Sequence, residues 1–306
     1  SNFVLDGVTS VITGNCGSSY TDIAHYAFQL DSARTSINVA SLIGHNSVRR
    51  AVMGESMRDP TSDEQKEMEA VVETAMQDGA VGMSTGLIYI PGTYSKTPEI
   101  IGMARVVSAY GGVYASHIRD EADHVTHAIE QAINIGRASN LPVQISHFKV
   151  TYKPNWGRSP SGLALVERAR SEGIDVTIDQ YPYVATSTSL NTRLPDWTFS
   201  GGRDSLMLRL QDADTRKQII KEMVKSLRDK KAKNYNYAVV ARFGADTTLN
   251  GLNISEINRL KGRKSKPNVE AETILQMVEQ GGAQMVFFSI HEDDLQKIMK
   301  YPFNMF

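Results

Sequence analysis

Two histidines occur in matching short motifs, Ser116-His117 and Ser146-His147, and they stand 30 residues apart. That interval is the length of one strand-helix-strand repeat, so each histidine is expected to end one of two neighbouring parallel strands. Neutral imidazoles bind Zn²⁺ at about 2.0–2.1 Å, and two of them make half of a zinc site. Either histidine alone is more simply a hydrogen-bonded strand end. The repeated motif favours a metal.

The single cysteine, Cys16, lies in the motif Gly14-Asn15-Cys16-Gly17 after the earliest strand-like run. The flanking glycines allow the backbone to pass close to a ligand. A lone thiol of this kind can be buried packing, a metal ligand or a nucleophile. As a thiolate it binds Zn²⁺ at about 2.3 Å, and Cys16 is therefore predicted to be the third ligand beside the two histidines.

Four other histidines have simpler interpretations. His45 ends another predicted strand, where it either lines a pocket or only forms a hydrogen bond at the mouth. His124 and His127 are three residues apart on a helix whose apolar stripe lies elsewhere, which indicates a solvated face. His291 precedes acidic residues that suit the first turn of a helix without any function.

Six runs rich in β-forming residues alternate with amphipathic helical patterns. The predicted strands are 8–13, 37–42, 81–85, 113–117, 143–147 and 176–179. This alternation predicts an α/β fold with a parallel sheet. Ligand-capable residues follow several of these strands, which favours a TIM-like (β/α)8 barrel over an open sheet with one switch point. No G-x-G-x-x-G follows the first strand and no Walker sequence occurs, which argues against nucleotide binding.

The alternation of strand and helix patterns divides the chain into three parts. Residues 1–190 are predicted to be barrel repeats 2 to 7, and residues 271–306 a return to the barrel. Residues 191–270 are charge-rich and are predicted to form an insertion. The insertion is either a lid that controls the substrate or a helix pair that decorates the surface.

Composition limits the class of partner. The 306 residues carry 33 basic and 34 acidic side chains, a net charge of −1, which argues against nucleic acid and anionic membranes. No stretch of about 20 apolar residues occurs, and residues 1–7 lack the basic and apolar regions of a signal peptide, although this start looks internal to a longer protein. The single cysteine favours the cytoplasm. A small-molecule partner is expected.

Together the motifs resemble those of the N-acyl-D-amino-acid deacylases, a branch of the amidohydrolase superfamily. The resemblance extends to about residue 190. It rests on Gly14-Asn15-Cys16-Gly17, Gly86-Leu87-Ile88-Tyr89 with Pro91-Gly92, His117-x-Arg119-x-Glu121, Ser146-His147-x-Lys149 and Asp179-Gln180-Tyr181-Pro182-Tyr183, which occur in the family's order and spacing.

The resemblance implies roles for individual residues. The metal ligands would be Cys16, His117 and His147, with the cysteine replacing the carboxylated lysine that bridges two metals in related hydrolases. One zinc ion would be tightly bound, with a second, weaker site left open. Tyr89 and Lys149 would bind the substrate carboxylate, and Tyr183 would polarise the scissile carbonyl. Arg119 would either bind an anion or be structural.

Two family features are missing from the sequence. The His-x-His pair of the first strand and the aspartate of the last strand, which is the general base, do not occur. The chain is therefore expected to be an incomplete barrel that lacks its first and last strands, and a portion of a longer protein. An incomplete barrel has exposed strand edges.

The implied reaction is the zinc-dependent hydrolysis of N-acyl-D-amino acids to a carboxylate and a free D-amino acid. One alternative is a cyclic-amide hydrolase similar to dihydroorotase or hydantoinase, although such enzymes typically use the bridging lysine. A second alternative is an inactive relative that serves as a binding protein. The preference for D substrates comes only from the resemblance. The side chain and acyl group of the substrate, the number of metals and the oligomeric state stay open.

Overall fold

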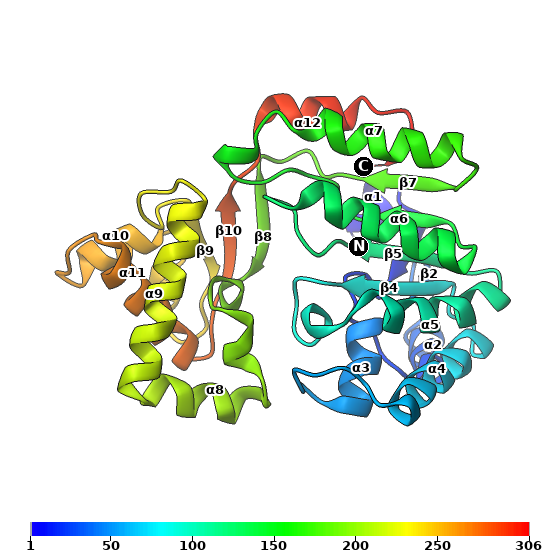
Figure 1. Ribbon diagram of the computed structural model, residues 1–306, viewed down its shortest axis with the longest axis horizontal. Helices are drawn as coiled ribbons and strands as arrows, with labels where there is room; N and C mark the ends of the chain where they lie inside the picture. Colours follow the sequence, from blue (N-terminus) through cyan, green and yellow to red (C-terminus); the bar gives the residue numbers. More distant parts are fainter. Residues whose placement is uncertain (1, 306) are drawn as a thin grey trace. The chain divides into compact units, whose positions relative to one another are not determined.

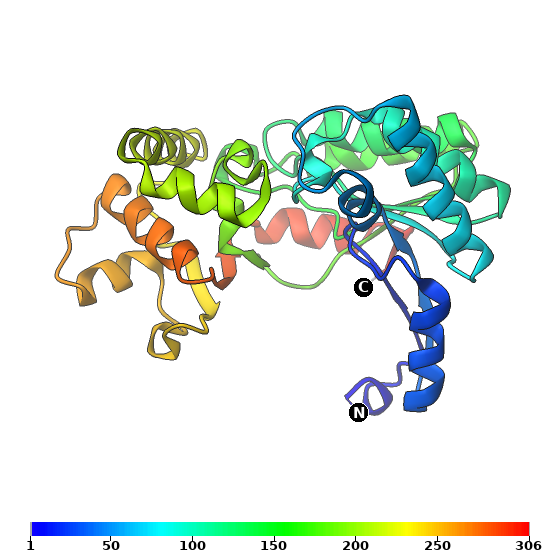
Figure 2. The same ribbon diagram turned by 90° about the horizontal axis from the view of Figure 1, so that it is seen from below.

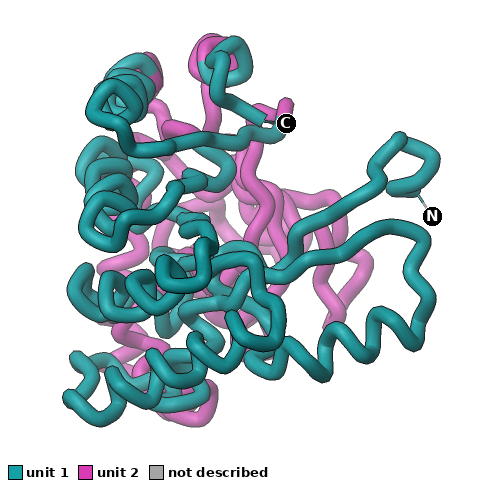
Figure 3. The backbone as a smooth tube through the Cα atoms, turned by 90° about the vertical axis from the view of Figure 1, so that its right-hand side faces the viewer, with its two compact units in different colours: residues 1–148, 160–181, 298–306 teal, residues 149–159, 182–297 magenta. Residues whose placement is uncertain are grey.

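The computed structural model describes residues 2–305, which form two compact units. Unit 1 contains residues 1–148, 160–181 and 298–306, and unit 2 contains residues 149–159 and 182–297 (Figure 3). The predicted insertion, 191–270, lies within unit 2. Residues 271–297, predicted to return to the barrel, also belong to unit 2.

Unit 1 contains a six-stranded parallel sheet in the order β11-β7-β6-β5-β4-β3. The strands are β3 (Ile43–Gly44), β4 (Gly82–Gly86), β5 (Val113–His117), β6 (Val143–Ile145), β7 (Val176–Asp179) and β11 (Asn304–Met305). The predicted α/β alternation is confirmed. Within residues 2–305, however, the sheet is open and no closed barrel is formed.

Helices separate the strands of this sheet along the chain (Figure 1). They are α3 (His45–Met53), α4 (Ser62–Gln77), α5 (Thr97–Ala109), α6 (Val125–Ser139), α7 (Ser159–Ser171) and α12 (Glu292–Met299). Each amphipathic helix places an apolar stripe in the core, as α5 does with Ile100, Met103 and Val107. The first turn of α4 is fixed by a capping box between Thr61 and Glu64.

The N-terminal segment forms a separate small sheet within unit 1. It consists of α1 (Asn2–Leu5), β1 (Ser10–Thr13), α2 (Ile23–Ala33) and β2 (Asn38–Ser41), and β1 pairs with β2 in parallel. Figure 2 shows α1 and α2 extending away from the other helices of the unit. Helix α2 buries only Ile23, whereas Phe28 is exposed.

Unit 2 has its own antiparallel sheet and its own core. Strand β10 (Gln284–Phe288) pairs with β8 (Ala185–Ser189) on one side and with β9 (Ala238–Arg242) on the other. The helices of this unit are α8 (Gly202–Gln211), α9 (Ala213–Asp229), α10 (Ile254–Leu260) and α11 (Pro267–Glu279). Buried residues from α9, α11 and β10 form one cluster, which includes Met223, Ile274 and Met285. The helices of unit 2 therefore bury their apolar faces against its own sheet.

Short 3₁₀ helices connect these elements: η1 (Gly92–Tyr94), η2 (Lys153–Asn155), η3 (Leu190–Arg193), η4 (Asp196–Phe199) and η5 (Thr247–Leu249). Among residues 2–305, none of the helices combines the length and the apolar content needed to span a lipid bilayer.

A buried tyrosine makes the stability of unit 2 sensitive to high pH. Burial, together with the neighbouring phenol of Tyr152, raises the pKa of Tyr237 to about 12, and Arg193 opposes this shift. In the unfolded chain the same phenol titrates near 10. The folded state therefore holds this proton more tightly, and the resulting stability is complete below about pH 10 and lost as the pH rises to about 12.

We expect Tyr237→Phe to lose less stability than the wild type over this alkaline interval. The measurement is the urea midpoint as a function of pH, monitored by the fluorescence of Trp156 and Trp197, which both lie in unit 2. Equal pH slopes in both proteins would contradict the assignment of this sensitivity to Tyr237.

Candidate metal centre

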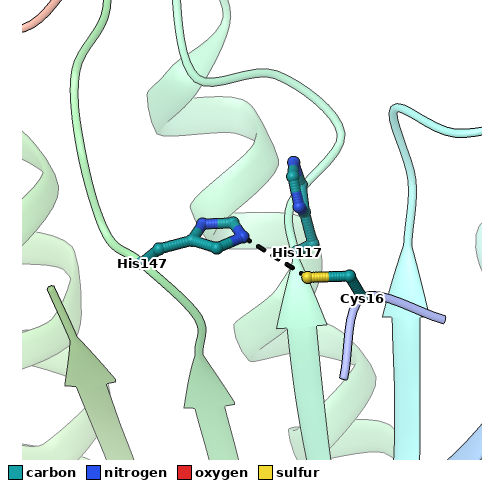
Figure 4. Close-up of side chains that lie close together, drawn as sticks. All are labelled: Cys16, His117 and His147. Atoms are coloured by element: carbon teal, nitrogen blue, oxygen red, sulfur yellow. Dashed lines mark hydrogen bonds between the residues drawn. The ribbon is translucent and has the colours of Figure 1, made fainter. Parts of the chain in front are cut away.

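Cys16, His117 and His147 come from three separate parts of unit 1 and meet at one place (Figure 4). Cys16 lies in the turn after β1, His117 is the last residue of β5, and His147 follows β6. Strands β5 and β6 are parallel neighbours, with Ser116 opposite Ile145. Their carboxyl ends therefore bring the two histidines to the same edge of the sheet.

The spacing of these three side chains fits a zinc ion. Their candidate ligand atoms all lie within 4.8 Å of one another. Ligands at the usual Zn–S and Zn–N distances with a tetrahedral angle between them are about 3.5 Å apart, and Cys16 Sγ lies 3.5 Å from His147 Nε2. The His117 and His147 rings are 4.2 Å apart at an interplanar angle of 81°. One thiolate and two imidazoles are a donor set that Zn²⁺ prefers.

Cys16 has a left-handed backbone, with φ 55°, which is unfavourable for a residue with a side chain. The loop is held by Ser84 of β4, whose hydroxyl accepts the Gly17 N–H at 3.0 Å and donates to the Gly14 carbonyl. At Gly17, φ is 78° and a Cβ atom would lie 2.6 Å from the Gly86 nitrogen. Strand β4 therefore fixes the path of the Cys16 loop at a distance that only glycine permits.

His147 is likewise left-handed, with φ 40°. Its N–H donates to Asp179 Oδ1 at 2.6 Å, and the other carboxylate oxygen accepts from Gln144 Nε2 at 2.6 Å. The next residue, Phe148, donates its N–H to the Asp179 carbonyl at 2.7 Å. Asp179, at the end of β7, therefore holds the backbone that presents His147.

Glu121 and Tyr181 of unit 1 also belong to this site, although the sequence analysis assigned no role to either residue. Glu121 Oε1 lies 3.2 Å from His147 Nδ1 and 3.5 Å from His117 Nε2. Burial, followed by the charges of Glu121 and other neighbours, raises the pKa of Tyr181, so its hydroxyl stays protonated. Both residues stand inside the quoted motifs, Glu121 four residues after His117 and Tyr181 two after Asp179.

The other predicted site residues have varied surroundings. The Tyr89 ring packs edge-on against His117 at 4.9 Å. Arg119 donates to the carbonyls of Thr93 at 2.9 Å and Ser95 at 2.8 Å, and its role as an anion-binding or structural residue stays a prediction. Lys149 and Tyr183 belong to unit 2, where Lys149 is buried and Tyr183 is 65% exposed. Their substrate-binding and catalytic roles stay predictions.

Three other histidines of unit 1 are not part of this cluster. His45 is fully buried at the start of α3, and its Nε2 is 2.9 Å from Glu99 Oε1. The same carboxylate forms an ion pair with Arg49, which is also fully buried. His45 therefore takes part in a buried polar network, the hydrogen-bonded alternative of the two that were open. His124 and His127 are exposed, as predicted.

Comparison with known proteins gives similar sequences and similar structures. No protein-family model matches the chain. The D-aminoacylase of Alcaligenes xylosoxydans xylosoxydans is 42% identical over 210 residues, which is 61% of this chain and 43% of the relative. The N-acyl-D-glutamate deacylase of the same organism is 39% identical over 206 residues, 60% of this chain and 42% of the relative. The chain thus spans less than half the length of these curated relatives.

Two solved structures cover almost the whole chain. A crystal structure of D-aminoacylase, described as defining a novel subset of amidohydrolases, aligns with a TM-score of 0.77 and 31% identity over 99% of this chain and 59% of that one. The N-acyl-D-glutamate deacylase of Bordetella bronchiseptica, in complex with zinc and a phosphonate inhibitor, aligns with a TM-score of 0.79 and 29% identity over the same shares. The resemblance that the motifs predicted is confirmed.

Proposed function

We propose, from the confirmed resemblance to the N-acyl-D-amino-acid deacylases, that the protein catalyses zinc-dependent hydrolysis of N-acyl-D-amino acids. The products are a carboxylate and a free D-amino acid. The observation that carries the proposal is the set formed by Cys16, His117 and His147, whose 3.5 Å sulfur-nitrogen distance fits a tetrahedral zinc site. The cyclic-amide alternative is not favoured, because the similar proteins carry the names of deacylases of N-acyl-D-amino acids.

Zinc at this position would supply a Lewis acid and lower the pKa of a bound water. The thiolate of Cys16 and the imidazoles of His117 and His147 would hold it. Tyr89 lies against His117 and is proposed to bind the substrate carboxylate together with Lys149, which would orient the amide for attack. Tyr183 is proposed to polarise the scissile carbonyl. The general base stays a prediction for a residue outside this chain.

We also propose that the open parallel sheet is part of a (β/α)8 barrel. The order β3 to β7 along the sheet follows the order along the chain, as in a barrel wall. A binuclear metal centre appears in the description of one D-aminoacylase structure with a TM-score of 0.76. We accordingly propose a second, weaker metal position beside the Cys16 site. The cytoplasmic location stays a prediction.

The test is metal removal and restoration in the purified full-length natural protein. We expect release of amine from N-acetyl-D-leucine and N-acetyl-D-glutamate, little from the L forms, loss of this activity after chelation, and recovery with about one equivalent of Zn²⁺. Tight zinc binding without hydrolysis of any N-acyl-D-amino acid would favour the inactive binding protein. Hydrolysis of dihydroorotate or a hydantoin alone would favour the cyclic-amide alternative.

A further inference from the structure

We infer that Glu121 is a positioning residue that holds both metal-binding imidazoles with a single carboxylate. Oε1 of this residue lies 3.2 Å from Nδ1 of His147 and 3.5 Å from Nε2 of His117, although these histidines follow different strands. The Glu121 side chain is only 12% exposed. This inference rests on the proposed zinc site and adds a determinant of its geometry.

The contacts of His147 define which ring nitrogen is available to a metal. Its Nε2 faces Cys16 Sγ at 3.5 Å, and its Nδ1 faces Glu121. A neutral imidazole carries one N–H donor and one acceptor, and a metal requires the acceptor nitrogen. A carboxylate at Nδ1 keeps the proton on that nitrogen. Nε2 then carries no proton, and its lone pair is directed toward Cys16 Sγ.

The same argument applies to His117 with the nitrogens reversed. Here Nε2 faces Glu121 at 3.5 Å, which is a charge contact and not a hydrogen bond. A carboxylate charge on that side favours the proton on Nε2 and directs Nδ1 to the metal. The two histidines would therefore use different ring nitrogens. One carboxylate beside two nearly perpendicular rings, at 81°, would favour both tautomers at once.

Neighbouring carboxylates have other bonding partners. Asp120 Oδ1 accepts the N–H groups of Ala122 and His124, which fixes the loop that carries Glu121. Asp179 accepts the backbone N–H of His147 and the side-chain amide of Gln144. Asp179 therefore places the His147 backbone, whereas Glu121 touches the imidazole rings themselves.

Removal of this carboxylate should weaken the metal site without removing a ligand. We expect Glu121→Ala to raise the zinc dissociation constant about 10- to 100-fold, the range for residues that orient metal ligands. Glu121→Gln keeps an acceptor oxygen without the charge and should recover part of the affinity. Zinc affinity is measured by competition with a chromogenic chelator in the full-length protein, so the readout does not depend on activity.

Spectroscopy separates positioning from a general loss of folding. In the wild type loaded with Co²⁺ we expect a thiolate-to-cobalt band, and ¹⁵N shifts of the zinc-loaded protein that assign opposite tautomers to the two histidines. Glu121→Ala should keep the thiolate band but broaden the tautomer signals. Glu130→Ala is the matched control, because it removes a carboxylate that pairs with Arg168 on the surface. That variant should retain wild-type affinity and spectra.

The outcomes distinguish this inference from the proposed function. Unchanged zinc affinity and imidazole shifts in Glu121→Ala would overturn it. The inference would also be overturned if X-ray absorption showed that Glu121→Ala loses an oxygen ligand of the metal, since Glu121 would then be a ligand itself. If Glu121→Ala does not fold, the comparison of Glu121→Gln with Glu130→Ala decides in the same way. Zinc binding with the expected variant effects, but no deacylase activity, would refute the proposed reaction and leave the role of Glu121 intact.

Discussion

Replacement of Cys16 by alanine is expected to abolish tight zinc binding and to lower deacylase activity by at least about 10³-fold. A catalytic metal contributes several kcal/mol of transition-state stabilisation, and each 1.36 kcal/mol is a tenfold change in rate. Cys16 would supply the only thiolate, because the chain has no other cysteine. Alanine retains the Cβ atom, so the left-handed backbone at this position is equally strained in both proteins.

The control for this variant is Ser18→Ala, two residues further along the same loop, where the side chain is exposed. It should bind zinc and hydrolyse substrate as the wild type does. Metal content by atomic emission, together with amine release from N-acetyl-D-leucine, measures both effects. If Cys16→Ala retained a full equivalent of zinc and its activity, Cys16 would be a packing residue, and the zinc site drawn from the motifs would be wrong.

The parallel strands of unit 1 could be located from hydrophobic periodicity and from the turn-forming residues that bound them. Strand β5 has the predicted bounds, 113–117, and β4 is displaced by one residue from the predicted 81–85. Both β4 and β5 are almost entirely buried and follow glycine-containing turns, so their sequence signal is strong. The convergence of His117 and His147 follows from the same cause, because one repeat of 30 residues places both at one sheet edge.

The division into units depends on information that local sequence does not contain. Ordinary strand and helix patterns occur in residues 182–190 and 271–297, and these patterns do not show which sheet the segments join. Strand β10, however, pairs antiparallel with both β8 and β9, and α11 packs in the cluster with α9. The choice of pairing partner is a tertiary property, and periodicity is the same for a strand in either sheet.

The parts of the site that were missed depend on side-chain contacts between elements. Glu121 was visible as part of a motif, but its contact with His147 depends on the course of the loop after β5, which Asp120 fixes through two backbone N–H groups. Arg119 stays open between its two roles, although its guanidinium donates to two carbonyls of the loop after β4. Spacing alone gives neither contact.

The second large effect is expected at Glu99, outside the metal centre. Glu99→Gln should lower the free energy of unfolding of unit 1 by about 3–5 kcal/mol, the usual loss when one partner of a buried ion pair is removed. Arg49 and His45 are fully buried, and both contact this carboxylate. Without it the guanidinium would remain as a buried charge with much less compensation. The exposed pair Arg137–Glu172 provides the matched control, and Glu172→Gln should cost about 0–1 kcal/mol.

The pH dependence of this network has a defined sign. Burial opposes ionisation of Glu99, but the hydrogen bonds and charges of His45 and Arg49 hold its pKa below the usual value. The stability that it contributes is therefore present above the pKa of an unfolded glutamate, near 4.3, and is lost as the pH falls through the lower pKa of the folded state. Glu99→Gln should lack this acidic component, so its disadvantage relative to the wild type should shrink at low pH.

The measurement must report on unit 1 separately from unit 2. Both tryptophans, Trp156 and Trp197, lie in unit 2, so their fluorescence does not follow the unfolding of unit 1. Hydrogen exchange of the α5 amides beyond its first turn follows unit 1 directly. Faster exchange in Glu99→Gln with unchanged fluorescence midpoints is the expected pattern. An effect as small as that of Glu172→Gln would mean that the buried carboxylate contributes no more than a surface pair, because water or a rearranged Arg49 then satisfies the charge.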